Sequence, residues 1–101
     1  MEVTVTESNF KEEVLESEIP VLVDFWASWC APCRMLAPVV AGIAEEKAGE
    51  IKVCKVNVDE EPVLAAAYRV SAIPTVVAFR GGQVVNTSVG FTTKEALLSL
   101  F

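Results

Sequence analysis

Two cysteines, Cys30 and Cys33, are separated by only Ala31 and Pro32, at the point where an apolar segment gives way to a helical pattern. Disulfide exchange requires one thiolate to attack and a second thiol close enough to release the mixed disulfide. Cysteines three apart in the first turn of a helix meet that requirement. The positive end of the helix dipole favours a thiolate at Cys30, whose sulfur we expect to be the more exposed. Pro32 suits this first turn, where no backbone donor is lost.

The same spacing also occurs in zinc sites, which need four ligands. The chain has three cysteines and no histidine, so neither a second CxxC pair nor an imidazole is present to complete such a site. The lack of histidine also removes Ser–His and Cys–His catalytic pairs, and three cysteines are too few for a disulfide scaffold. We therefore expect no metal and no bound cofactor. Zinc binding and a purely structural cysteine pair are the minor alternatives.

Asp24 places a carboxyl group inside the apolar segment 21–27 (VLVDFWA), and two interpretations of it remain open. It can be a buried acid with a structural partner, the commoner case. It can also be a proton acceptor for a thiol, with a pKa raised by desolvation. Asp24 reaches a sulfur only if the following helix packs back over the strand, which would bring Cys33 nearer to it than Cys30. Lys55 is the candidate ionic neighbour, or otherwise a snorkelling surface lysine.

Three further positions are of interest for chemistry. The Ile73–Pro74 bond precedes a hairpin pattern, and the frequencies of X–Pro isomers favour the trans form. Gly90 ends the last predicted strand and is expected to lie in a turn. Cys54 alternates with its strand neighbours, which predicts a buried small apolar side chain rather than a third redox cysteine.

The segments that must position these residues alternate between strand and helix. Strand patterns occupy residues 3–6, 21–27 and 51–58, helical patterns occupy 8–17 and 32–48, and a short helix begins at Pro62. Segment 21–27 is apolar on both faces except at Asp24, which is typical of a central strand covered by helices on each side. Ser8 or Asn9 is the candidate N-cap of the first helix, and Pro38 predicts a kink in the second.

The pattern changes after residue 74. Residues 75–79 and 83–89 flank the pair Gly81-Gly82, which predicts an antiparallel hairpin. Thr92 and Glu95 have the spacing of a capping box that opens a last helix ending near Phe101. The predicted order is β-α-β-α-β-α-β-β-α: an α/β fold with a mixed five-stranded sheet, helices on both faces, and residues 1–101 in one domain.

Composition limits the classes of partner. The net charge is −6, from 8 basic and 14 acidic residues without a basic cluster, so we expect no nucleic-acid partner. The apolar runs are far shorter than the ~20 residues of a membrane span, so we expect no membrane association. The first ten residues carry two glutamates and no basic residue of a secretory signal. We therefore expect a cytoplasmic protein.

Taken together, several motifs resemble the thioredoxin family, in order and over nearly the whole chain: DFWASWCAPCR at 24–34, Pro38, Lys55, Ile73-Pro74-Thr75 and Gly90. The match is far more specific than CxxC alone. The resemblance implies a thioredoxin fold, a monomer, and reduction of disulfides in protein substrates. It also implies a flavin-containing thioredoxin reductase, which uses NADPH, as the electron-donating partner.

The resemblance implies roles for individual residues. Cys30 would be the nucleophile and Cys33 the resolving thiol, while Asp24 would assist proton transfer at Cys33 through water, with Lys55 tuning it. The bond before Pro74 would be cis and face the cysteines, and the backbone before it would pair with the substrate chain. The substrate would lie in an apolar groove, and the residues that bind it would be Trp29, Ala31, Pro32, Ile73, Pro74, Gly90 and Phe91.

Two positions depart from the family pattern. Ala31 stands where glycine is usual, and Arg34 replaces the usual lysine while keeping its charge. The dipeptide between the cysteines helps set the balance between thiol and disulfide forms, so Ala31 leaves the reduction potential open. Two alternative functions remain open. One is an oxidant or isomerase with the same fold, and the other is a non-enzymatic binding module that uses the apolar groove.

Overall fold

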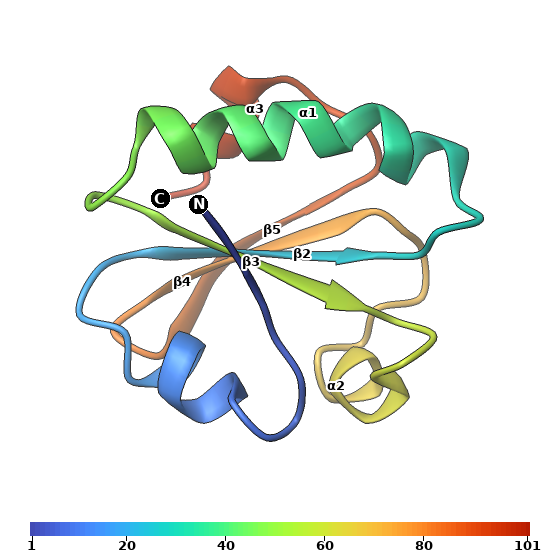
Figure 1. The fold of residues 1–101 in the computed structure, drawn as a ribbon, viewed down its shortest axis with the longest axis horizontal. Coiled ribbons are helices and arrows are strands. Elements are labelled where there is room, and N and C mark those ends of the chain that lie inside the picture. Colours follow the sequence, from blue (N-terminus) through green and yellow to red (C-terminus); the bar gives the residue numbers. More distant parts are fainter.

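The computed structural model describes residues 1–101 and contains a five-stranded mixed sheet with helices on both faces (Figure 1). In chain order the elements are β1 (Glu2–Thr4), the π-helical segment η1 (Lys11–Leu15), β2 (Val21–Trp26), α1 (Ala31–Glu46), β3 (Lys52–Asn57), α2 (Pro62–Ala67), β4 (Thr75–Arg80), β5 (Gln83–Val89) and α3 (Lys94–Leu98). The predicted element order and fold class are confirmed.

The sheet order is β1-β3-β2-β4-β5, which places β2 in the middle. β3 runs parallel to both β1 and β2, whereas β4 is antiparallel to β2 and β5 is antiparallel to β4. In this register Asp24 lies beside Lys55 of β3 and Val76 of β4. The apolar character of β2 follows from this position, because its side chains meet helices above and below the sheet.

Two hydrophobic cores lie on opposite faces of the sheet. α1 and α3 cover one face, and η1 and α2 cover the other (Figure 1). The core under α1 and α3 includes Leu22 and Leu97, which are buried with the helix residues Leu36, Val40 and Ile43. These three recur at the i, i+4, i+7 spacing that the sequence predicts for this helix. Helix α1 continues past Pro38, which lies on its exposed side.

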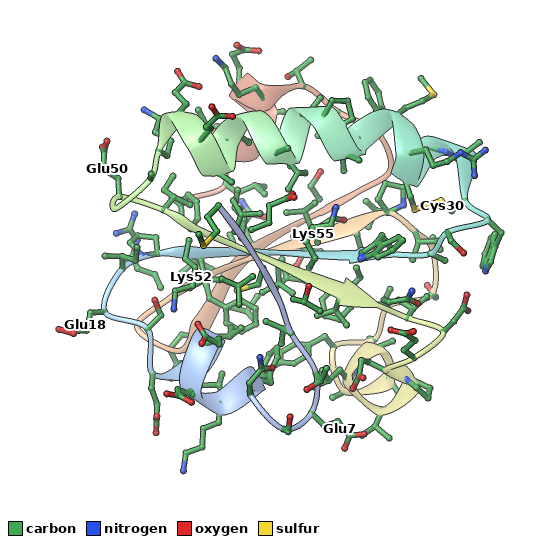
Figure 2. All side chains as sticks on the ribbon, viewed as in Figure 1. Glu7, Glu18, Cys30, Glu50, Lys52 and Lys55 are labelled. Atoms are coloured by element: carbon green, nitrogen blue, oxygen red, sulfur yellow. A yellow bond between two sulfur atoms is a disulfide. The ribbon has the colours of Figure 1, made fainter.

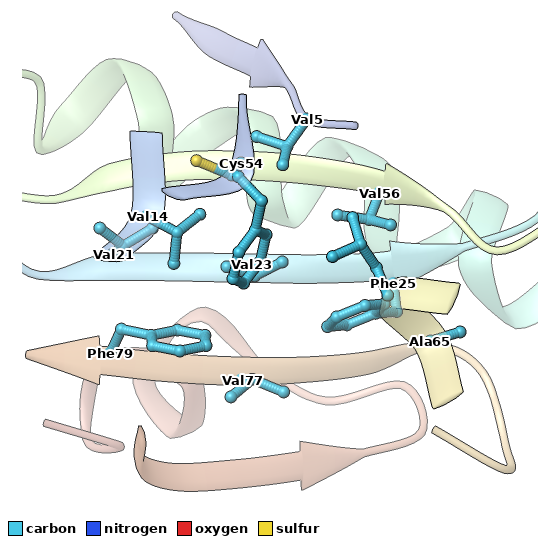
Figure 3. Close-up of a cluster of buried hydrophobic side chains, with 12 residues drawn as sticks. Val5, Val14, Val21, Val23, Phe25, Cys54, Val56, Ala65, Val77 and Phe79 are labelled. Atoms are coloured by element: carbon cyan, nitrogen blue, oxygen red, sulfur yellow. The ribbon is translucent and has the colours of Figure 1, made fainter. Parts of the chain in front are cut away.

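The core under η1 and α2 is the aromatic one. Phe10 and Phe79 contact Tyr68 with ring centroids 5.3 and 5.4 Å apart, and Phe25 lies 6.3 Å from the same ring. Valines from β2, β3 and β4, together with Val5 and Val14, fill the space around these rings (Figure 3). Alternate residues of β2, β3 and β4 supply one core or the other, because side chains along a strand point to opposite faces.

Both predicted helix caps are wrong. The Asn9 side chain accepts a hydrogen bond from the Thr6 N–H at 2.7 Å and donates to the Thr4 carbonyl at 3.1 Å, so it closes the loop after β1. Segment η1 begins after Phe10 without a side-chain cap. Helix α3 is capped by Thr93, whose Oγ1 accepts from the Ala96 N–H, rather than by Thr92. For α3 the neighbouring Thr93 has the same capping chemistry as Thr92, and the local backbone decided which of the two capped.

Candidate active site

Cys30 and Cys33 form a disulfide where the loop after β2 enters α1, with their Cα atoms 5.2 Å apart (Figure 2). Cys30 is the N-cap of α1 and has extended backbone dihedrals, and Pro32 lies in the first turn. The Cys33 N–H donates to the Cys30 sulfur at 3.2 Å. A sulfur in an N-cap position thus receives a backbone donor and the positive end of the helix dipole, and both favour a thiolate.

In the disulfide form each of the two cysteine residues is 4% exposed. They pack together with Ala27, and Ile73 lies against this small cluster. The difference between the two sulfurs lies in their surroundings. The Cys30 sulfur lies 3.7 Å from the Ile73 carbonyl oxygen as well as next to the Cys33 N–H.

The segment before β4 faces the cysteines, and its Ile73–Pro74 bond is cis. The trans isomer expected from frequencies alone is therefore wrong, and the isomer implied by the family resemblance is present. The Gly90 N–H donates to the Pro74 carbonyl at 2.8 Å, which joins the end of β5 to the start of β4. Gly90 has a φ of +92°, a conformation that favours glycine.

Two aromatic side chains on this side of the molecule are largely exposed, Trp29 at 67% and Phe91 at 50%. Ala31 and Pro32 are also exposed, and Pro74 is buried. The residues expected to form a groove line none of the cavities in the structure. The largest cavity, about 290 Å³, lies near the C-terminal end of α1 and holds no cysteine.

Asp59 is a further neighbour of the site and lies outside the motifs identified in the sequence. The indole Nε1–H of Trp29 donates to Asp59 Oδ2 at 2.9 Å, and this bond holds the ring beside the cysteines. The Asp59 N–H in turn donates to Asn57 Oδ1 at 2.9 Å. Asp59 lies two residues after the end of β3, and the carboxyl ends of neighbouring parallel strands meet at one edge of a sheet. That rule could have placed Asp59 next to the loop that carries Trp29.

Asp24 and Lys55 lie side by side across β2 and β3, with Lys55 Nζ 3.2 Å from Asp24 Oδ2. The Asp24 side chain is 1% exposed and that of Lys55 17%. Burial raises the pKa of the Asp24 carboxyl group above its ordinary value, while the charge of Lys55 opposes that rise and the charge of Glu2 adds to it. Apart from Lys55, no group approaches the Asp24 oxygens closely enough to hydrogen-bond to them.

A cavity of about 220 Å³ lies beside this pair and is lined by Trp26, Cys33, Arg34, Ala37 and Lys55. Cys33 therefore opens onto the same space as the lysine that contacts Asp24, whereas Cys30 does not line it. Helix α1 produces this arrangement by packing back over β2. Such packing is the condition for the Asp24 carboxyl group to reach a sulfur.

Cys54 lies on the opposite face of β3 from Lys55, inside the aromatic core (Figure 3). Its side chain is inaccessible, and burial raises the pKa of its thiol to about 12. A thiol in that state is a poor nucleophile at neutral pH. Cys54 is thus a packing residue, as its alternation along the strand predicts.

The structure holds no metal-binding cluster and no helix that could cross a membrane. Nowhere do three or more His, Cys, Asp or Glu side chains gather closely enough to hold a metal ion. No helix is both long enough and apolar enough to cross a membrane.

Comparison with known proteins gives matches over nearly the full chain. The thioredoxin family model matches residues 1–101. The chain is 57% identical over 93 residues to "Thioredoxin 1" of Nostoc sp. (strain PCC 7120), covering 92% of this chain and 87% of that protein. It is 56% identical, with the same coverage, to "Thioredoxin 1" of Synechococcus elongatus. Identity to "Thioredoxin" of Rickettsia felis is 49% over 94 residues, which are 93% of this chain and 90% of that protein.

Proposed function

The chain belongs to the thioredoxin family and is a protein-disulfide reductase that works by dithiol–disulfide exchange, and we propose that Cys30 is its nucleophile and Cys33 its resolving thiol. One observation carries this assignment of roles. The Cys30 sulfur caps α1 and accepts the Cys33 N–H at 3.2 Å, so a negative charge on this sulfur is stabilised by the helix that follows.

In the first step the Cys30 thiolate attacks one sulfur of the substrate disulfide. A bond forms between Cys30 and the substrate, the substrate S–S bond breaks, and the released sulfur leaves as a thiolate that takes up a proton. Deprotonated Cys33 then attacks the Cys30 sulfur and expels the second substrate sulfur, which is also protonated. Two electrons pass to the substrate, and the protein is left with the Cys30–Cys33 disulfide.

Asp24 is the proton acceptor for Cys33 in this proposal, and Lys55 tunes it. Burial raises the pKa of Asp24, so its carboxyl group exchanges a proton closer to neutral pH than an exposed aspartate does. Lys55 and Cys33 line the same cavity, whose volume of about 220 Å³ exceeds the ~30 Å³ of a water molecule. Water in that cavity is the proposed carrier of the proton between Cys33 and Asp24.

The substrate docks on the surface around the cysteines. The exposed rings of Trp29 and Phe91 supply apolar contact area. The Ile73 backbone, with its carbonyl oxygen 3.7 Å from the Cys30 sulfur, pairs with an extended substrate segment. Ala31, Pro32, Pro74 and Gly90 complete this proposed binding surface.

The physiological setting is proposed from family membership. A flavin-containing thioredoxin reductase, using NADPH, returns the disulfide to the dithiol, so the protein takes part in electron transport and cellular redox homeostasis. The protein acts as a cytoplasmic monomer of one domain, without nucleic-acid or membrane partners. Its excess of acidic residues, with a net charge of −6, argues against nucleic acid as a partner.

The roles of the two cysteines are tested by two single variants in a protein-disulfide reduction assay. Cys30→Ser removes the attacking sulfur and should abolish reduction. Cys33→Ser keeps the first step but not the second, so it should accumulate a covalent mixed disulfide with the substrate, visible by non-reducing electrophoresis. Equal activity of the two variants, or trapping by Cys30→Ser instead, would contradict the assignment.

A further inference from the structure

Lys55 lies between two carboxylates rather than one. Its Nζ is 3.2 Å from Asp24 Oδ2 and 3.9 Å from Glu2 Oε2. Glu2 comes from β1, which runs parallel to β3 with Glu2 beside Val53 and Thr4 beside Lys55. Residues paired in this way point to the same face of a sheet, so Glu2 lies on the face that holds Asp24. Its side chain is 32% exposed, compared with 1% for Asp24.

We propose that Glu2 is a positioning residue for the buried Asp24, acting through the shared ammonium group of Lys55. The inference rests on the proposed role of Asp24 as proton acceptor for Cys33. It assigns to the short strand β1 a part in the reaction that the cysteine motif does not contain.

The physical reason is that one cation cannot fully neutralise two anions. When Asp24 is ionised, Lys55 stabilises it at 3.2 Å, but Glu2 attracts the same ammonium group and also repels the Asp24 charge. Glu2 therefore favours the protonated form of Asp24. Its charge raises the pKa of Asp24 in the same direction as burial, against the effect of Lys55.

Other groups near Asp24 do not replace Glu2 in this role. From β4 the neighbour in register is the apolar Val76. From α1, Cys33 and Arg34 line the cavity beside Lys55, but the Arg34 guanidinium donates outward to the Ser28 carbonyl at 2.9 Å. The N-terminal ammonium lies on the far half of α1, 3.4 Å from the Ala44 carbonyl. Glu2 is thus the one carboxylate besides Asp24 that forms an ion pair with Lys55.

The test compares Glu2→Gln with Glu18→Gln. Both remove one negative charge, but Glu18 is exposed at the end of the molecule away from Cys30 (Figure 2). The carbon-13 signal of the Asp24 carboxyl group is followed by NMR as a function of pH. We expect Glu2→Gln to move this titration to lower pH, and Glu18→Gln to leave it in place. An unchanged Asp24 titration in Glu2→Gln, or an equal shift in both variants, would overturn the inference.

The pH profile of disulfide reduction supplies the second readout. In its acidic limb Glu2→Gln should be about two- to threefold faster than wild type, because more Asp24 is ionised there. High salt should bring the wild-type reduction rate at acidic pH closer to that of Glu2→Gln, since Glu2 is partly exposed and its charge is screened. If the role of Glu2 were merely structural, Glu2→Gln would change neither the acidic part of the pH–rate profile nor its dependence on salt.

Asp24→Asn separates failure of the inference from failure of the proposed function. If Asp24→Asn leaves the rate profile unchanged, Asp24 is not the proton acceptor, and the proposed function fails at that point. The Asp24 NMR titration in Glu2→Gln does not depend on turnover, so it still decides whether Glu2 acts on Asp24 through Lys55.

Discussion

At the residue scale, Asp24 is both a candidate proton acceptor and a source of instability. Its carboxyl group is buried in the central strand, and the single cation beside it is shared with Glu2. The raised pKa of Asp24 means that the folded protein holds this proton more tightly than the unfolded chain does. As pH rises from the unfolded-state value of about 4 through the raised folded-state value, the folded state therefore loses stability.

Asp24→Asn should remove that loss. At pH 4 the variant and wild type should have similar free energies of unfolding. At pH 8 the variant should be more stable, by an amount on the order of 1 kcal/mol or more, because asparagine never has to ionise. Urea denaturation of the oxidised proteins at both pH values measures this, with Glu18→Gln as a control that should show no such pH-dependent gain. A stability difference that does not change with pH would contradict the raised pKa of Asp24.

At the element scale, the hairpin of β4 and β5 depends on a turn that only glycine fits well. Gly81 and Gly82 have φ values of +59° and +77°. A Cβ atom on Gly82 would lie 2.7 Å from the backbone oxygen of Leu15, at the end of η1, whereas one on Gly81 would meet nothing within 4 Å. The turn therefore also serves as the contact between the hairpin and the first helical segment.

Gly82→Ala should accordingly be more destabilising than Gly81→Ala. Both substitutions place an alanine in the left-handed region, at about 1 kcal/mol each. The contact with Leu15 should raise the total for Gly82→Ala to roughly 2–4 kcal/mol, because backbone must move to relieve it. Thermal and urea unfolding of the two variants measure the difference, and equal stabilities would show that the Leu15 contact is easily relieved.

At the scale of the whole molecule, the sheet order brings the cysteines, Asp59 and the Ile73–Pro74 segment to one edge of the sheet. β2 leads into the cysteines, β3 leads to Asp59, and the start of β4 and the end of β5 meet beside them through the bond between Gly90 and Pro74. This gathering of strand ends supports a docking surface for a protein substrate, but the direction of electron flow depends on the reduction potential.

We expect the Cys30–Cys33 pair to be a reductant despite Ala31 between the cysteines. Its potential should lie at or below the cytosolic glutathione range of roughly −220 to −260 mV. Equilibration in glutathione buffers, with the dithiol quantified by thiol labelling, measures it directly, and Ala31→Gly shows how much the alanine contributes. A potential well above that range would make the protein an oxidant or isomerase with the same fold.

Features that depend on neighbouring residues could be predicted from the order of amino acids alone. Strand and helix periods, the Gly81-Gly82 turn and the CxxC spacing act over a few positions, so the element order and the chemistry of Cys30 and Cys33 could be predicted. The predicted helix N-caps were wrong, because adjacent polar residues such as Thr92 and Thr93 have similar chemistry and differ only in backbone conformation.

The surroundings of the reacting groups depend instead on contacts between distant parts of the chain. The Asp24–Lys55 pair was anticipated, but Glu2 joins it because β1 pairs with β3, and Asp59 holds Trp29 because two strand ends meet. Both contacts join residues far apart in the chain. A carboxyl pKa depends on burial and on every charge within several ångströms, so the proton chemistry beside Cys33 is a property of the assembled sheet rather than of the cysteine motif alone.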